Sequence, residues 1–258
     1  MFDKNVQNKI LRACALRSSD TVLEIGAGYG ALTGLISQEA QRVAALEIDS
    51  DLCAYLREHF AAFSNISVIH QDILKFDLRK HFSDTASSDI TVIGNIPYYI
   101  TSPIIEHLFE FRDMVKVMYL TVQKEFAERI IAVPGSKTYG SFSCFVQYHA
   151  VPKILFLIKK NSFKPAPKVD SCFIRIALRP RPAVEAKNEA SLFTIIRKAF
   201  NQRRKTLRNS LSGVVPEKKL SEFFISRALD ADIRPEDMAL EDFAALANMY
   251  EQALKGEK

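Results

Sequence analysis

The sequence predicts a doubly wound α/β fold, in which helices cover a mostly parallel β-sheet, followed by a small all-helical domain. Short runs of β-branched and apolar residues alternate with helical segments through the first two-thirds of the chain. This alternation is typical of parallel strands that are buried on both faces. From residue 191 onward only helical periodicity is present. With 258 residues, 48% of them hydrophobic, the chain can form one large domain and a smaller one.

Five buried strands are predicted in the first part of the chain. In chain order they are residues 21–26 (TVLEIG), 42–47 (RVAALE), 66–70 (ISVIH), 90–94 (ITVIG) and 115–122 (VKVMYLTV). A helix is expected over residues 50–60, with Ser50 or Asp51 as its N-cap. Its apolar face is expected to carry Leu52, Tyr55, Leu56 and His59.

Two further strands, residues 152–160 and 171–178, complete the sheet. The segment between them is too short and too rich in proline for a helix, so we expect them to form an antiparallel hairpin at one edge. Residues 179–189 contain two prolines, several charges and few apolar side chains, which is typical of a linker. We therefore predict a catalytic domain over residues 1–180 and a helical domain over residues 181–258.

Composition excludes several classes of protein. No apolar run is long enough to cross a membrane, and charges occupy the start of the chain, so a cytoplasmic protein is expected. The cysteines, Cys14, Cys53, Cys144 and Cys172, lie far apart without a CxxC pair, which favours buried thiols over disulfides or zinc. We assign no metal site. The formal net charge of +5 suits a polyanionic partner without identifying one.

A glycine-rich loop follows the first predicted strand. Gly26, Gly28 and Gly30 allow a sharp turn and close approach of a ligand to the backbone, although such glycines also serve turns and packing alone. Glu47 ends the second predicted strand, 21 positions after Gly26. A carboxylate at this point can accept hydrogen bonds from both ribose hydroxyls of a nucleoside cofactor.

The cofactor is predicted to be S-adenosylmethionine. The glycines occupy alternate positions and do not follow the G-x-G-x-x-G pattern of NAD-binding loops. Glu24 would also repel a pyrophosphate, so a nucleoside ligand with a cationic amino-acid tail is favoured over NAD. Asp72 ends the third strand and can accept from an adenine amino group while Ile73 packs on the ring; alternatively, Asp72 is only a helix N-cap. The predicted cofactor residues are Glu24, Gly26, Gly28, Glu47, Ile48, Asp72, Ile73 and Asn95.

An Asn-Ile-Pro-Tyr tetrad, residues 95–98, ends the fourth strand, where open α/β sheets bind their ligands. The side-chain oxygen of Asn95 and the carbonyl of Ile96 can accept both N–H bonds of an adenine amine and aim its lone pair at a sulfonium methyl. Pro97 fixes the backbone, and Tyr98 offers a ring for base stacking. The alternative is a proline turn with a buried tyrosine. Tyr99 is assigned no role and is a candidate for the core.

These motifs resemble those of the ribosomal RNA adenine N6,N6-dimethyltransferases. The resemblance rests on VLEIGAGYGALT, ALEIDSDL, QDILKFDL and NIPYYITSPII, and it extends to SFKPAPKVDSCFIRI (162–176) and AFNQRRKTLRNSL (199–211). It implies a class I methyltransferase (Rossmann-like) fold with a seven-stranded sheet. It also implies that Phe163 stacks on the target base opposite Tyr98. The last two stretches favour the small-subunit, KsgA-type branch.

The resemblance further implies a reaction and its partners. Two adjacent adenines near the 3′ end of small-subunit rRNA would each receive two methyl groups from S-adenosylmethionine, on a pre-small-subunit particle during late assembly and by a monomeric enzyme. The family usually starts with Gln-(Asn/His)-Phe-Leu before its xDxNVxxKI motif, whereas here Met1-Phe2-Asp3 aligns with the end of that segment. We therefore expect the N-terminal cofactor contacts to be absent and assign no site residue there.

A basic cluster precedes the C-terminal helices. Its six cations, with no acidic residue between them, are Arg197, Lys198, Arg203, Arg204, Lys205 and Arg208. Phe193, Ile196, Phe200, Leu207 and Leu211 recur at helical spacing, so a single basic helix is predicted. We expect its charged face to bind RNA phosphates, although a solvated helix face would look similar.

Two other functions remain open from the residues. A large-subunit rRNA methyltransferase of the erythromycin-resistance type would share the cofactor site and the Asn-x-Pro-Tyr motif. A non-catalytic RNA- or DNA-binding assembly or transcription factor would keep the basic cluster, but the intact tetrad Asn95–Tyr98 argues against loss of activity.

Overall fold

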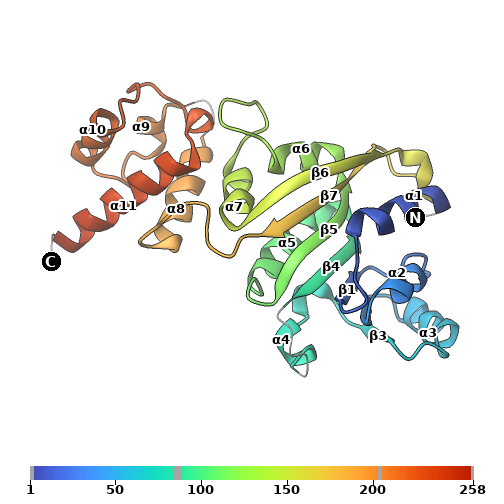
Figure 1. Ribbon diagram of the computed structural model, residues 1–258. Helices are drawn as coiled ribbons and strands as arrows, with labels where there is room; N and C mark the ends of the chain where they lie inside the picture. The colour runs from blue at the N-terminus through green and yellow to red at the C-terminus, as the bar shows by residue number, and fades with distance from the viewer. Residues whose placement is uncertain (1–2, 84–88, 203–204, 257–258) are drawn as a thin grey trace. The chain divides into compact units, whose positions relative to one another are not determined.

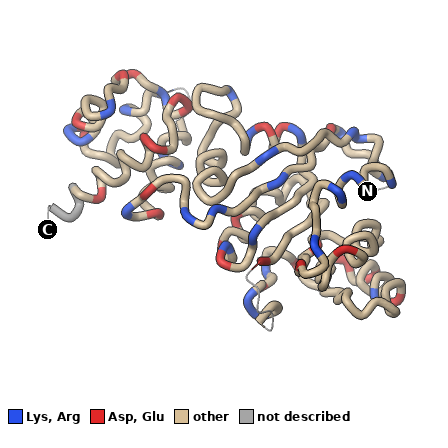
Figure 2. The backbone as a smooth tube through the Cα atoms, viewed as in Figure 1, with Lys and Arg blue, Asp and Glu red and all other residues tan. Residues whose placement is uncertain are grey.

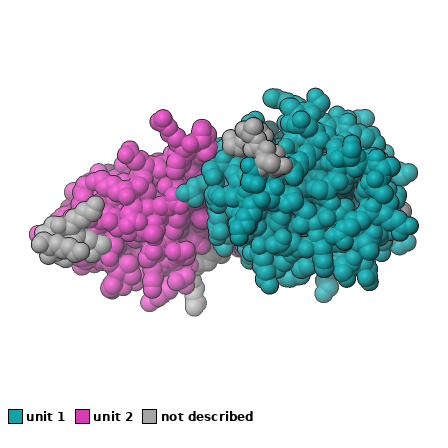
Figure 3. Space-filling model, turned by 90° about the horizontal axis from the view of Figure 1, so that it is seen from below, with its two compact units in different colours: residues 1–127, 151–178 teal, residues 128–150, 179–258 magenta. Residues whose placement is uncertain are grey.

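The computed structural model describes residues 3–83, 89–202 and 205–256 (Figure 1). The chain divides into two compact units, which Figure 3 distinguishes by colour. Unit 1 comprises residues 1–127 and 151–178, and unit 2 comprises residues 128–150 and 179–258. Residues 128–150, which the sequence grouped with the catalytic domain, thus cluster with the C-terminal helices.

Unit 1 is built on a seven-stranded sheet of order β3-β2-β1-β4-β5-β7-β6. The strands are β1 (Thr21–Ile25), β2 (Arg42–Glu47), β3 (Ile66–His70), β4 (Ile90–Asn95), β5 (Val115–Gln123), β6 (Ala150–Ile158) and β7 (Ser171–Leu178). β1 to β5 pair in parallel, and β7 pairs antiparallel with β5. The predicted mostly parallel sheet with antiparallel strands at one edge is therefore confirmed.

One helix precedes β1, and further helices follow the parallel strands (Figure 1). They are α1 (Lys4–Cys14), α2 (Thr33–Glu39), α3 (Ser50–His59), α4 (Leu78–His81), α5 (Thr101–Phe109) and α6 (Lys124–Ile130). Three short 3-10 helices accompany them: η1 (Ile73–Lys75), η2 (Tyr98–Ile100) and η3 (Lys160–Ser162). Two of these, η2 and η3, lie beside the candidate site described below.

Position in the sheet decides how deeply each strand is buried. All five residues of β1 are buried, because β1 has a strand on each side and helices in its connections. β3 is only half-buried and ends at an exposed His70, because it is an edge strand. The prediction of a fully buried strand at residues 66–70 was therefore wrong.

The predicted details of α3 need two corrections. Asp49, rather than Ser50 or Asp51, is the N-cap, and its carboxylate accepts the backbone N–H groups of Asp51 and Leu52. The helix buries Cys53 and Leu56. Tyr55 and His59 are exposed, and their rings stack on one another at the surface, with centroids 5.4 Å apart. Aromatic side chains at helical spacing here form a surface pair instead of a core face.

Unit 2 is helical in the region that the structure describes. Its elements are α7 (Ser141–His149), α8 (Glu189–Phe200), α9 (Leu207–Ser210), α10 (Glu217–Ser226), η4 (Pro235–Asp237) and α11 (Leu240–Gly256). The apolar residues of the basic cluster, from Phe193 to Leu211, are buried in the core of this unit. However, α8 ends at Phe200 and α9 starts at Leu207, so the basic cluster spans two separate helices and not the single helix that was predicted.

All four cysteines are free and buried, as predicted. Burial raises the pKa of both Cys14 and Cys144 to about 12, so neither thiol is ionised near neutral pH. Among the residues that the structure describes, no helix has the length and apolar character that a bilayer crossing requires. The same residues contain no cluster of three His, Cys, Asp or Glu side chains arranged to hold a metal ion.

Candidate active site

The candidate site lies where β1, β2, β3 and β4 end (Figure 1). Ile25, the last residue of β1, is paired with Leu46 of β2 and Gly94 of β4, so these strand ends are level with one another. The loop that leaves β1 is tied to β2, because Gly26 N donates to the Leu46 carbonyl at 2.9 Å. A Cβ on Gly26 would come within 3.5 Å of the carbonyl oxygen of Asn95. The glycine loop therefore touches the start of the tetrad.

Two glycines of the loop serve different purposes. Gly28 and Gly30 have φ angles of +58° and +76°, a region that disfavours other residues. A Cβ on Gly30 would lie 2.5 Å from the ring of Phe60, so this glycine is required by packing. A Cβ on Gly28 would meet no atom within 4 Å. The backbone at Gly28 thus faces open space, as a loop that receives a ligand should.

Glu47 holds the loop in place. One carboxylate oxygen accepts Gly28 N at 2.8 Å, and the other accepts the N–H groups of Ile48 and Asp49 at 2.8 and 3.1 Å. The side chain is 7% exposed. A carboxylate has about four lone-pair positions, so three backbone donors leave capacity for a ligand hydroxyl. Glu47 thus fits the predicted ribose contact and also fixes the loop that would cradle the cofactor.

Glu24 is the most deeply buried acid of the site, at 3% exposure. Its carboxylate accepts a hydrogen bond from the Thr33 hydroxyl at 2.6 Å. Burial raises the pKa of Glu24 to about 7, and the negative Glu47 nearby adds to the rise, while the bond from Thr33 opposes it. A cationic ligand group would stabilise the carboxylate form of Glu24, which agrees with the predicted preference for a sulfonium and ammonium ligand over a phosphate.

The remaining predicted cofactor residues follow β2 and β3. Ile48 is 65% exposed, and Ile73 is 6% exposed. Asp72 caps η1, because its Oδ1 accepts Leu74 N at 3.0 Å. The N-cap role is thus present, and it uses one of the two carboxylate oxygens. An apolar Ile48 this exposed beside Glu47 is what a site for a flat base would provide.

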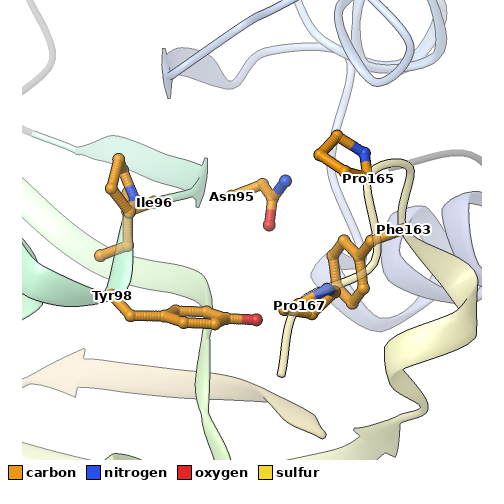
Figure 4. A pocket seen from close by; sticks show the side chains of 7 residues that line it. Asn95, Ile96, Tyr98, Phe163, Pro165 and Pro167 are labelled. Atoms are coloured by element: carbon orange, nitrogen blue, oxygen red, sulfur yellow. The ribbon is translucent and has the colours of Figure 1, made fainter. Parts of the chain in front are cut away.

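All five predicted catalytic residues line one cavity of about 220 Å³. They are Asn95, Ile96, Pro97, Tyr98 and Phe163. Figure 4 shows the Asn95 amide, the Tyr98 ring and the Phe163 ring directed toward a common space. Drug-sized ligands occupy pockets of roughly 300–1,000 Å³, so this cavity suits a single flat base. Pro165 and Pro167 complete the lining; no role was predicted for these two residues of the KPAPK segment, 164–168.

The two aromatic walls of the cavity are anchored differently. The Tyr98 hydroxyl lies 2.5 Å from the Ser171 hydroxyl at the start of β7. Phe163 follows η3 directly, and its N–H donates to the Lys160 carbonyl at 3.3 Å. Tyr99 is 85% exposed, so it is not part of the core as the sequence suggested. Sequence reasoning missed Ser171, which no spacing rule connects to a residue 73 positions earlier.

The basic cluster belongs to unit 2. Arg197 and Lys198 are exposed on the last turn of α8, and Lys205 is exposed in the loop that follows. Arg208 forms an ion pair with Glu217 and stacks over Phe224. Arg203 and Arg204 lie outside the described residues. Figure 2 shows that Lys and Arg occur in both units, so the cluster is not the sole source of positive charge.

The family model described as ribosomal RNA adenine dimethylase matches residues 1–252. The chain belongs to the ribosomal RNA adenine dimethylase family. The family and the enzyme class that the sequence predicted, an adenine dimethyltransferase acting on ribosomal RNA, are thereby confirmed. A protein of Bacillus pumilus named ribosomal RNA small subunit methyltransferase A is 38% identical over 98% of this chain and 89% of its own length. One of Lachnoclostridium phytofermentans with the same name is 40% identical over 99% and 90%.

Two solved structures share the fold of this chain. A dimethyladenosine transferase from Plasmodium falciparum has a TM-score of 0.82 and 25% identity, over 99% of this chain and 98% of its own. The 23S rRNA methyltransferase ErmE has a TM-score of 0.75 and 24% identity, over 98% and 100%. The second likeness shows the fold alone. The class I methyltransferase fold predicted for this member of the dimethylase family is confirmed.

Proposed function

We propose that this dimethylase transfers methyl groups from S-adenosylmethionine to the N6 amines of two adjacent adenines near the 3′ end of small-subunit rRNA. The observation that carries the proposal is the convergence of five residues, Asn95 to Tyr98 and Phe163, on one base-sized cavity next to the glycine loop. The adjacent target adenines and their position in the rRNA come from the sequence resemblance.

The residues of the cavity suit the reaction because each solves one part of it. S-adenosylmethionine supplies an electrophilic sulfonium methyl group when bound. The Asn95 side-chain oxygen and the Ile96 carbonyl would accept the two N–H bonds of the amine and so turn its lone pair out of conjugation with the ring. Tyr98 and Phe163 would hold the base between two aromatic faces. Orientation then provides most of the rate enhancement, and no strong base is needed.

The cofactor is assigned to the ends of β1, β2 and β3. Gly26 and Gly28 leave room for it, and Glu47 offers remaining acceptor capacity for ribose hydroxyls. Glu24 would face the cationic tail. Ile48, Asp72 and Ile73 would surround the adenine ring of the cofactor, with Asn95 shared between the two ligands.

The small subunit is favoured as the substrate over the large one. The relatives from Bacillus pumilus and Lachnoclostridium phytofermentans, matched over nearly their full length, are named for the small subunit. We further propose that the enzyme acts as a monomer in the cytoplasm on a pre-small-subunit particle, which couples methylation to late assembly. The catalytic domain is assigned to residues 1–180 and RNA binding to the helical domain, residues 181–258, through Arg197, Lys198 and the other cations of the cluster.

The test is methyl transfer to purified undermethylated small subunits, followed by mass spectrometry of the rRNA nucleosides. We expect N6,N6-dimethyladenosine with small subunits and none with large subunits. Asn95→Ala should abolish the product while RNA affinity stays unchanged, because Asn95 acts on the amine and not on the phosphates. Methylation of large subunits in preference to small ones would contradict the substrate, and normal turnover by Asn95→Ala would contradict the role of Asn95.

A further inference from the structure

Two adjacent residues at the start of β7, Asp170 and Ser171, connect to both aromatic walls of the cavity. Neither lines the cavity itself. Ser171 is fully buried and paired with Gln123 in the ladder between β5 and β7. The backbone carbonyl of Asp170 accepts Lys124 N at 3.1 Å. Both residues are thus fixed by the sheet and can act as rigid anchors for groups that are not part of it.

Ser171 anchors the Tyr98 wall. Its hydroxyl is 2.5 Å from the Tyr98 hydroxyl, a short distance even for an O–H···O bond. The hydroxyl oxygen of a tyrosine lies on the long axis of the ring, so a bond at this atom fixes the direction in which that axis points. Tyr98 is only partly buried, and η2, which carries it, has no side-chain cap. The bond to Ser171 is therefore the polar contact that holds the ring across the cavity.

Asp170 anchors the Phe163 wall. One carboxylate oxygen of Asp170 accepts a hydrogen bond at 3.0 Å from the backbone N–H of Lys160, which is the first residue of η3. The other oxygen accepts one at 2.9 Å from Lys159 Nζ. Phe163 ends the same turn through its bond to the Lys160 carbonyl. From the other side, Ser162 is tied to Asp3 through the Asp3 backbone N–H at 3.4 Å. The carboxylate thus closes the loop between β6 and β7 at its base and orients the ring at its start.

We propose that Asp170 and Ser171 are positioning residues for the target adenine, which together set the separation and orientation of Phe163 and Tyr98. Because Ser171 is the first residue of β7 and Asp170 directly precedes it, both walls of the cavity are held from the same end of this strand. The inference rests on the proposed function, since it assigns the cavity to the base. It accounts for the Val-Asp-Ser segment of the sequence, to which no function had been assigned.

The Ser171 bond is tested by a double-mutant cycle with Ser171→Ala, Tyr98→Phe and the double variant. The measured quantities are kcat/KM for undermethylated small subunits, the Kd of S-adenosylmethionine by calorimetry, and the midpoint of unfolding. Each single variant should lose roughly tenfold in kcat/KM, because the ring remains but its orientation is lost. The double variant should lose no more than either single one, and the cofactor Kd should stay within about twofold of wild type.

The Asp170 contact is tested with Asp170→Ala and Asp170→Asn against Asp89→Ala. Asp89 is a matched control, because it also pairs with a surface lysine, Lys116 at 3.1 Å, and lies before β4, at the end of the sheet away from the site. Asp170→Ala should raise KM for the subunit roughly tenfold. Asp170→Asn should lose less, since an amide oxygen still accepts Lys160 N, and Asp89→Ala should match wild type.

Three results would overturn the inference. Ser171→Ala with wild-type kcat/KM would exclude the anchor, as would a double variant whose loss is the product of the two single losses. Equal KM values for Asp170→Ala and Asp89→Ala would exclude the loop clamp. A purely structural role would lower the unfolding midpoint and leave kcat/KM of the folded enzyme unchanged.

If Ser171→Ala does not fold, Tyr98→Phe and Asp170→Asn still decide the question. Failure of the wild-type enzyme to bind the cofactor or to methylate would instead contradict the proposed function.

Discussion

Replacing Gly30 by alanine is expected to destabilise unit 1 through two separable effects. The first is backbone strain, because Gly30 has a φ of +76°, and an L-residue in this region costs about 1–2 kcal/mol. The second is overpacking, because the new Cβ would lie 2.5 Å from Phe60 Cε2 and 3.0 Å from Leu56 Cδ2. Phe60 and Leu56 are buried, at 6% and 0% exposure, so they cannot swing into solvent.

The magnitude follows from adding these effects. Overpacking of a well-packed core costs about 1–3 kcal/mol. Together with the strain, Gly30→Ala should lower the free energy of unfolding by about 2–5 kcal/mol. Gly28→Ala is the matched control in the same loop: its φ is +58°, but no atom lies within 4 Å of the added Cβ. It should cost only the strain, about 1–2 kcal/mol.

The assay is urea unfolding in the absence of cofactor. Unfolding is monitored by far-ultraviolet circular dichroism, because the chain contains no tryptophan whose fluorescence could report it. The difference between the two variants isolates the contact with Phe60. If Gly30→Ala is no less stable than Gly28→Ala, the reasoning from packing is refuted. The order should reverse for the Kd of S-adenosylmethionine, since Gly28 faces the open side of the loop.

Three further predictions concern charged residues. Relative to Glu24→Gln, wild type should lose about 3 kcal/mol of unfolding free energy as pH rises from 4.5 to 7. The buried Glu24 carboxyl has its pKa raised to about 7, so the native state keeps a proton that the unfolded chain releases in this range. Denaturant titrations across this pH range measure the loss, and parallel pH profiles of stability for the two proteins would contradict it. Glu47→Gln should weaken S-adenosylmethionine binding roughly tenfold or more by calorimetry, because an amide cannot accept all three backbone N–H groups at once; an unchanged Kd would refute the role. The double variant Arg197→Ala with Lys198→Ala should reduce the slope of log Kd for rRNA against log salt by about 1–2. Arg208→Ala should change this slope less, because Arg208 is already paired with Glu217. Equal slopes for wild type, the double variant and Arg208→Ala would show that the cluster does not bind phosphates.

Much of the fold was predictable because its signals are local. Each predicted strand lies within a residue or two of the observed one, since runs of β-branched apolar residues bounded by polar ones leave little choice of element. The glycine spacing and the position of Glu47 likewise placed the loop at the end of β1. The five residues predicted to be catalytic line one cavity because four are consecutive and the fifth belongs to a recognisable loop.

The errors arose where tertiary contacts override local pattern. Periodicity between Phe193 and Leu211 predicted one helix, but the apolar residues at both ends of that pattern are buried in the same core from two separate helices, α8 and α9. Asp49 is the N-cap of α3 because its carboxylate accepts two backbone N–H groups. Residue propensities do not locate a helix start to within one residue, so the sequence did not distinguish Asp49 from its neighbours. Ser171 was not identified because its contact with Tyr98 joins β7 to η2, two elements that lie 73 positions apart in the chain.

In the sheet order β3-β2-β1-β4-β5-β7-β6, the strands beside the methyl-donor site come early in the chain, and β7, beside the second wall of the acceptor cavity, comes late. The residues assigned to the methyl donor fall within the first 95 positions, whereas the second wall of the acceptor cavity and both of its anchors come from positions 163–171. Exchange of that later segment between homologues would therefore alter which nucleotide is accepted and leave the donor half intact.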